Sequence, residues 1–194
     1  MIVRRFNCAA AVVSTAAVAA GLLTGCATGE EKAVPELPER ICWNGAFAGS
    51  DVSPLLPPGD EVKFSRLAGR HFALTEESDS AICTLYIDGN TKFQASADLE
   101  NFEDSIEWSS WDPAHPKPLA VGEKGIIWDT GAASYFICEP AKNPNSPGRY
   151  IELMITAHYA PDKSKLQAAL PELMKEFMAY AQRELRCTGG AAPK

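Results

Sequence analysis

Histidine is scarce in this sequence, and the usual catalytic motifs are missing. Only three histidines, His71, His115 and His158, occur among 194 residues. They lie in strand-like runs or in a proline-rich loop, where a histidine is more often structural than catalytic. No Gly-x-Ser-x-Gly, Ser-x-x-Lys or His-Glu-x-x-His pattern occurs, and no glycine-rich loop of the kind that cradles phosphates. We therefore predict no catalytic residue and no cofactor. A Ser–His–Asp arrangement assembled across the fold stays open, because sequence distance does not exclude it.

Basic residues are too few for a nucleic-acid-binding protein. The chain has 18 Lys and Arg against 25 Asp and Glu, a net charge of −7 at pH 7, and such a chain is repelled by nucleic acid and by anionic lipid heads. Five carboxylates lie within ten residues, at Asp98, Glu100, Glu103, Asp104 and Glu107. Their spacing does not match the twelve-residue calcium loop. We predict a solvated acidic surface there, and no metal site.

No apolar run is long enough for a typical membrane span, but the N-terminus has the parts of an export signal. Arg4-Arg5 precede an apolar run over residues 8–23, which is shorter and richer in alanine than the roughly 20 strongly apolar residues of a membrane span. The run ends in Leu23-Thr24-Gly25-Cys26, which resembles a bacterial lipobox. This resemblance implies cleavage after residue 25 and a diacylglyceryl group on Cys26. A plain secretory signal with a coincidental cysteine is the alternative.

Cleavage at that point would leave 169 residues, enough for one domain with a hydrophobic core. The removed segment carries two arginines and no acidic residue, so the net charge would fall to −9. Two acyl chains attach a protein stably to a bilayer, which predicts an extracytoplasmic protein held at the cell membrane. Residues 26–40 are charged and contain two prolines, and we expect them to form a flexible tether. A globular domain over 41–188 and a disordered tail over 189–194 complete the predicted organisation.

Four cysteines remain in the predicted mature domain: Cys42, Cys83, Cys138 and Cys187. An even number in an exported domain predicts two disulfides, with three possible pairings. Zinc sites need closely spaced cysteines, whereas the gaps here are 41, 55 and 49 residues. Cys42 and Cys187 lie at the two ends of the domain, and the other two cysteines lie in strand-like runs. We therefore predict Cys42–Cys187 and Cys83–Cys138, with the other pairings as alternatives.

Hairpin signals dominate the domain. Asp88-Gly89-Asn90 and Asp129-Thr130-Gly131 separate runs rich in β-branched and aromatic residues, after a short helical or turn-rich segment at 42–56. The strands we expect are 62–67, 71–75, 83–87, 91–95, 125–128, 133–138 and 150–159.

A single long helix is expected to start at Pro161-Asp162. Its apolar positions trace one face, and they are Leu166, Leu170, Leu173, Phe177, Ala181 and Leu185. Pro171 predicts a kink or a fresh helix start. The fold class is therefore α+β, a single domain with about six or seven mainly antiparallel strands and the C-terminal helix packed on one face.

The chain resembles small lipoproteins of actinomycete type, a group that includes families without assigned function. The resemblance rests on the lipobox, the acidic tether with its prolines, the Cys42-Trp43 opening with Leu55-Leu56-Pro57, and the positions of Cys83, Cys138 and Cys187. It covers most of residues 41–187 and implies no catalytic residue.

The function that these features favour is that of an anchored, non-enzymatic binding or interaction module, whose partner is an envelope protein or a small ligand. Trp108 and Trp111 lie in a polar loop and are candidate partner contacts, because tryptophan is enriched at binding hot spots. Alternatively, their rings cover the sheet edge. A carrier of a lipid or small apolar ligand would need an apolar cavity of about 300–1,000 Å³. An envelope hydrolase would need a nucleophile within reach of one of the histidines.

Overall fold

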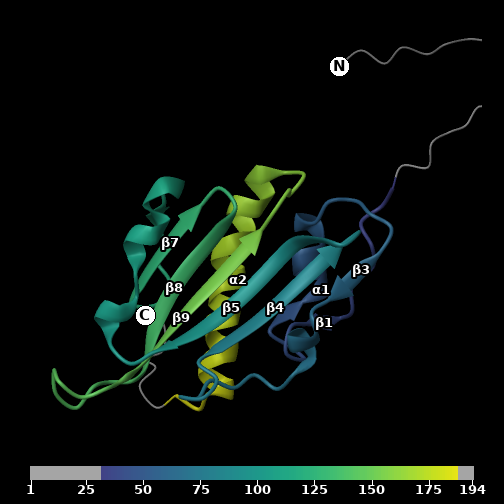
Figure 1. Ribbon diagram of the computed structural model, residues 1–194. Coiled ribbons are helices and arrows are strands. Elements are labelled where there is room, and N and C mark those ends of the chain that lie inside the picture. The colour runs from purple at the N-terminus through teal and green to yellow at the C-terminus, as the bar shows by residue number, and fades with distance from the viewer. Residues whose placement is uncertain (1–31, 188–194) are drawn as a thin grey trace, which may run out of the picture. The chain divides into compact units, whose positions relative to one another are not determined.

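A seven-stranded antiparallel sheet lies at the centre of the structure, a computed structural model that describes residues 32–187 (Figure 1). The predicted signal peptide, the lipidation of Cys26 and the predicted tail lie outside these residues. The strand order is β3-β4-β5-β9-β8-β7-β6, which confirms the predicted number and direction of strands. The strands are β3 (Val62–Phe64), β4 (Ser80–Ile87), β5 (Asn90–Glu100), β6 (Lys117–Pro118), β7 (Lys124–Trp128), β8 (Gly131–Glu139) and β9 (Arg149–Ala157).

Both predicted hairpins form. Asp88 and Gly89 join β4 to β5 with φ angles of 50° and 76°, the double left-handed conformation that a two-residue type I′ turn requires. Asp129 and Thr130 join β7 to β8. The turns match the sequence signals because the conformation of a two-residue turn is determined mainly by the residues within it.

The strand predicted at 71–75 is wrong. Phe72 and Leu74 are buried while their neighbours are exposed, so the alternation typical of a strand is present. Thr75, however, exchanges its backbone hydrogen bonds with Ser78 in a local turn, and 71–74 have no partner strand. Just before this segment, η2 (Arg66–Gly69) is a 3-10 helix, where the sequence predicted the continuation of a strand from Val62.

The long helix α2 (Lys163–Glu184) begins where the sequence predicted. The Asp162 carboxylate accepts hydrogen bonds from the N–H groups of Ser164 and Lys165, at 2.9 and 3.0 Å, a standard N-cap. α2 is one helix with Pro171 inside it, so the fresh start considered at that proline does not occur. The helix covers one face of the sheet (Figure 1). Among residues 32–187, no helix is long and apolar enough to cross a membrane.

Alternate residues of the central strands build the core beneath α2. On β5 the buried positions facing the helix are Phe93, Ala95 and Ala97, and the residues between them point to the open face. The helix contributes the face that the sequence predicted, with Leu166, Leu170, Leu173, Phe177 and Ala181 all buried. The space between sheet and helix is therefore filled with side chains.

The predicted disulfide pairing is wrong. The structure contains Cys42–Cys83 and Cys138–Cys187, with Cα atoms 5.5 and 4.6 Å apart. Cys83 lies on β4 and Cys138 on β8, and β5 and β9 separate these strands. Three strand spacings amount to about 14 Å, well beyond the roughly 7 Å that a disulfide allows between Cα atoms. Each sheet cysteine is instead linked to a segment from one end of the domain.

Residues 32–40 lie against the domain, so the flexible tether predicted for 26–40 is wrong for this part. The N–H of Gly59 donates to the carbonyl of Ala33 at 3.1 Å, and Val34 and Leu37 pack against the core. In a free tether these backbone groups and this apolar surface would be exposed to water, whereas here they are hydrogen-bonded or packed against the core.

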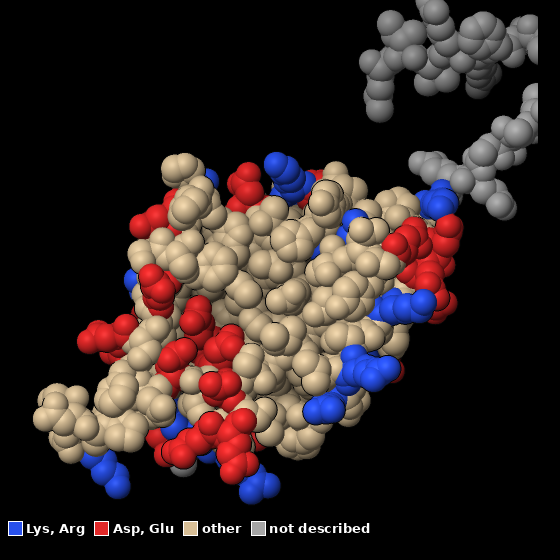
Figure 2. Space-filling view, viewed as in Figure 1, with Lys and Arg blue, Asp and Glu red and all other residues tan. Residues whose placement is uncertain are grey.

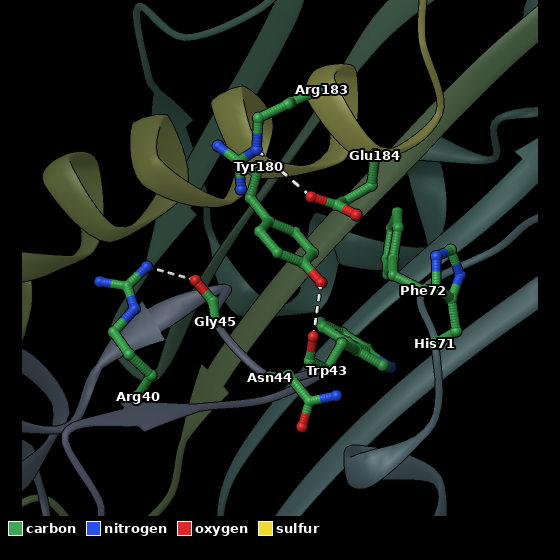
Figure 3. Close-up of a pocket in the computed structure, with 9 residues that line it drawn as sticks. All are labelled: Arg40, Trp43, Asn44, Gly45, His71, Phe72, Tyr180, Arg183 and Glu184. Atoms are coloured by element: carbon green, nitrogen blue, oxygen red, sulfur yellow. Dashed lines mark hydrogen bonds and ion pairs between the residues drawn. The ribbon is translucent and has the colours of Figure 1, made fainter.

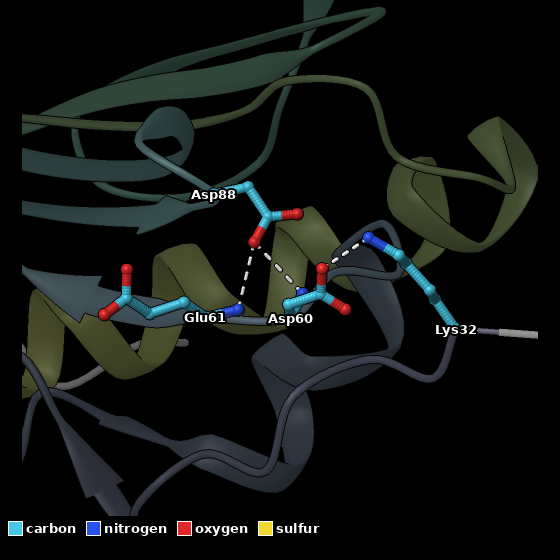
Figure 4. Close-up of polar contacts among 4 residues, drawn as sticks. All are labelled: Lys32, Asp60, Glu61 and Asp88. Carbon is cyan, nitrogen blue, oxygen red and sulfur yellow. Dashed lines mark hydrogen bonds and ion pairs between the residues drawn. The ribbon is translucent and has the colours of Figure 1, made fainter.

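Lys32 docks beside the β4–β5 turn (Figure 4). It forms an ion pair with Asp60, and the N–H groups of Asp60 and Glu61 donate to the Asp88 carboxylate, both at 3.0 Å. The two backbone donors, first that of Glu61, lower the pKa of Asp88. The start of the described chain is thus fixed to the turn end of the β4–β5 hairpin.

Replacing Cys42 and Cys83 together by alanine is expected to lower the free energy of unfolding by about 4 kcal/mol in the chain-entropy model. Urea unfolding of the wild type and of the double variant measures the difference, and the Cys138→Ala/Cys187→Ala variant provides a matched comparison. Peptide mapping under non-reducing conditions checks the pairing. A peptide in which residue 42 is linked to residue 187 would contradict the structure.

Candidate functional site

Three consecutive residues of the N-terminal loop adopt a left-handed backbone. Cys42, Trp43 and Asn44 have φ angles of 59°, 49° and 63°, and the N–H groups of Gly45 and Ala46 both donate to the Cys42 carbonyl at 2.9 Å. The result is one turn of left-handed helix, between the short strands β1 (Arg40–Ile41) and β2 (Phe47–Ala48). Each such residue costs about 1–2 kcal/mol relative to the right-handed form. A conformation of this kind persists only where its surroundings hold it.

Contacts from several distant segments hold the left-handed turn. The disulfide to Cys83 fixes its first residue to β4. The backbone N–H of Trp43 donates to Ala68, and the Tyr180 hydroxyl on α2 donates to the Trp43 carbonyl at 2.7 Å. The Trp43 ring stacks on Phe177 with centroids 5.4 Å apart. Sheet, helix and loop therefore all specify this turn.

A surface cleft of about 430 Å³ opens beside the turn (Figure 3). We call it the Trp43 cleft, and its lining residues are Arg40, Trp43, Asn44, Gly45, His71, Phe72, Tyr180, Arg183 and Glu184. Three of these, Trp43, Phe72 and Tyr180, are buried aromatic residues, and the exposed side chains of Arg40 and Arg183 lie at the rim.

A second hollow of about 200 Å³ lies next to the same turn. It shares Arg40 and Asn44 with the Trp43 cleft and is otherwise lined mainly by apolar residues such as Ile41, Phe64 and Ala68. The turn thus projects between two depressions of the surface, with Asn44 exposed between them.

The rim of the Trp43 cleft carries more positive than negative charge. Arg40 donates to the Gly45 carbonyl, and Arg183 donates through Nε to Glu184 at 3.2 Å while its guanidinium lies over the Tyr180 ring, 5.2 Å from the centroid. Among residues 32–187, the terminal nitrogens of Arg183 and the guanidinium of Arg40 have no carboxylate partner within salt-bridge distance. Two arginines and one carboxylate therefore line the cleft, and the carboxylate is paired with Arg183.

Tyr180 remains a neutral hydrogen-bond donor in this setting. Burial and, to a smaller extent, the Glu184 carboxylate raise the pKa of Tyr180 to about 12, against the opposing effects of Arg183 and Arg40. The phenol therefore keeps its proton at neutral pH and holds the Trp43 carbonyl.

The three histidines do not come together. His71 lines the Trp43 cleft, His115 follows the 3-10 helix η4 (Trp108–Ala114), and His158 follows β9. None of the nine residues lining the cleft is a serine, threonine, cysteine or aspartate. The cleft therefore offers His71 no serine, threonine or cysteine nucleophile among its lining residues.

Trp108 and Trp111, the candidate partner contacts, both pack against the sheet. Trp111 stacks on Trp128 with centroids 4.6 Å apart and 21° between the rings. Trp108 lies 5.9 Å from the Tyr135 ring, with the Lys124 ammonium 4.5 Å from its own centroid. Both tryptophans are half-buried. This is the arrangement of the alternative interpretation, in which the rings cover the sheet.

Carboxylates gather at one end of the open face of the sheet, and most of the remaining surface in that view is uncharged (Figure 2). Asp98 on β5 lies directly opposite Glu152 on β9, an unfavourable pair of like charges. Burial, together with the smaller effects of Asp98 and Glu100, raises the pKa of Glu152 to about 7. Asp98 and Glu100 are half-buried, so the solvated acidic surface predicted from the sequence is confirmed only for Glu103, Asp104 and Glu107. In the part of the chain that the structure describes, no group of side chains is arranged to hold a metal ion.

Sequence reasoning did not find the residues of the Trp43 cleft. Arg40 fell within the predicted tether, and Tyr180 and Arg183 come from the end of α2, 137 or more residues away from the turn they adjoin. Of the lining residues, only Trp43 and His71 were named from the sequence, Trp43 as part of the family resemblance and His71 as one of the three histidines. No local signal marks three L-residues for a left-handed turn, because distant contacts impose it.

Comparisons of the chain with protein-family models, with curated proteins and with solved structures found no match. The fold and the cleft define the molecule instead as an α+β domain, linked internally by two disulfides, with a preformed surface cleft whose rim is cationic.

The raised pKa of Glu152 predicts that the domain loses stability as the pH rises. The usual glutamate pKa is 4.5 and the folded value is about 7, so the folded state binds more protons between these values, and stability falls across that interval. Glu152→Gln is expected to raise the melting temperature at pH 8 much more than at pH 4.5. Thermal unfolding at both values checks this, with the exposed Glu76→Gln as the control. An equal shift at both values would contradict the assignment.

Proposed function

We propose that this protein is an exported lipoprotein, attached to the membrane through Cys26, that acts as a non-enzymatic binding module with the Trp43 cleft as its ligand site. The observation that carries the binding role is the left-handed turn at Cys42, Trp43 and Asn44. Strained backbone that the rest of the fold holds in place is concentrated at functional sites, and here it adjoins the cleft.

The anchor is supported by the chemistry of the chain. Leu23-Thr24-Gly25-Cys26 provides a lipidation signal, and two disulfides are typical of proteins that fold in an oxidising compartment. A diacylglyceryl group has the two chains that stable attachment needs. The acidic chain itself has no excess of basic residues with which to bind lipid heads.

The cleft favours a polar ligand over the apolar one that a lipid carrier would hold. Its rim is formed by charged side chains, whereas fully buried residues such as Phe93, Leu153 and Phe177 fill the interior between sheet and helix. Its volume of about 430 Å³ falls within the range of small-molecule sites, about 300–1,000 Å³.

Metabolic labelling with an alkyne-bearing palmitate tests the anchor. We expect the wild-type protein to be labelled and to sediment with membranes, and Cys26→Ala to lose both properties because the acceptor thiol is gone. Cys8→Ala is the matched control, since it removes a cysteine of the signal segment and leaves the acceptor. Label on the Cys26→Ala protein, or an unlabelled wild type, would overturn the anchor.

Native mass spectrometry of the protein extracted from its own membranes tests the ligand site. We expect a bound small molecule on the wild type, and its occupancy should fall at least tenfold in His71→Trp, where a large ring fills the Trp43 cleft. Ala114→Trp, at an exposed position of η4, should leave the occupancy unchanged. Equal occupancy in both variants, or no bound molecule on the wild type, would contradict this use of the cleft.

A further inference from the structure

We infer that the Trp43 cleft binds an oxyanion, a carboxylate or phosphate group, through the guanidinium groups of Arg183 and Arg40. This inference rests on the proposed ligand site and specifies the chemistry of its ligand. Its basis is the contrast between the charge of the whole chain, −7, and the charges at this cleft, where two arginines and one glutamate meet.

Arg183 has unused donors in a suitable position. Its Nε bonds Glu184 and its planar group lies over Tyr180, so the terminal nitrogens remain available at the rim (Figure 3). A guanidinium presents its N–H groups as a rigid fork that matches carboxylate and phosphate geometry. The side chain is 62 % exposed, which leaves room for a ligand to approach it.

Arg40 supplies the second cation from a different element. It reaches across the β1–β2 hairpin to the Gly45 carbonyl, which orients the guanidinium beside the left-handed turn. Arg40 also acts on Glu176, where it opposes the rise in pKa caused by burial, and Glu176 lies outside the residues that line the cleft. The two arginines therefore converge on the cleft from the N-terminal loop and from the last turn of α2.

Replacing Glu184 is expected to change the affinity for an oxyanion in the opposite direction to replacing Arg183. Its carboxylate is the single negative charge among the lining residues and already accepts from Arg183. Removing that charge should strengthen oxyanion binding, whereas removing Arg183 should weaken it. A purely structural role for this pair would not produce opposite effects on affinity.

Isothermal titration calorimetry on the mature lipoprotein in neutral detergent tests the inference. The probes are succinate, methyl phosphate and glycerophosphoglycerol, the last being the headgroup of phosphatidylglycerol, with neutral succinamide as the matched control. We expect at least one anionic probe to bind and succinamide to give no heat. The anion that responds shows whether a free acid, a phosphate ester or a lipid headgroup is the source of the oxyanion.

Variants then locate the site. Arg183→Gln should lower the affinity for the probe that binds by about tenfold or more, the loss typical of a charge-assisted hydrogen bond. Arg40→Gln should lower this affinity too. Glu184→Gln should strengthen it several-fold, and Arg70→Gln, an exposed arginine outside the cleft, should have no effect. Unchanged melting temperatures establish that each variant is folded.

Two results would overturn the inference. One is the absence of heat with all three anions, and the other is an affinity that Arg183→Gln leaves unchanged. If the wild type nevertheless carries a molecule that His71→Trp displaces, the cleft remains a ligand site and only its assignment to an oxyanion fails.

Discussion

Burial of the Trp43 ring is the constraint on which the site depends. The ring lies between Phe72, from the extended segment before β4, and Phe177, from α2, and the backbone that carries it is left-handed on both sides. Packing of this aromatic cluster, the Cys42–Cys83 disulfide and the Tyr180 hydrogen bond together offset the strain of the turn. The cleft is therefore a product of the core, and its shape is fixed before any ligand arrives.

The separation of charge over the surface follows from the two faces of the sheet. Side chains of β5 and β9 that point away from α2 bring Asp98, Glu100 and Glu152 together, whereas the arginines of the cleft lie at the end of α2 and on the N-terminal hairpin. A net negative charge thus coexists with a local cationic rim. Burial, and then repulsion by neighbouring carboxylates, raises the pKa of Glu152 to about 7 and also raises the pKa of Glu100.

Local chemistry made much of the fold predictable. Asp88-Gly89 dictates its turn, Asp162 caps its helix, and the spacing from Leu166 to Ala181 gives the buried face of α2. The features that could not be predicted are non-local. The disulfide pairing depends on the order of strands in the sheet, which places two strands between Cys83 and Cys138. The cleft depends on Arg40 and Arg183 meeting across the fold, and neither residue carries a local sign of it.

The docking of Lys32 beside Asp60 and Asp88 limits how the domain can stand on a membrane. Cys26 and Lys32 are six positions apart in the sequence, a span of at most about 20 Å. The docking point is at the turn end of β4 and β5, the same end of the sheet as the start of α2, where Gln167 bonds Trp128. The Trp43 cleft is lined by Tyr180, Arg183 and Glu184, from the other end of that helix. An anchor at Cys26, as proposed above, would hold this docking point near the membrane and leave the Trp43 cleft at the opposite end of α2 from the point of attachment.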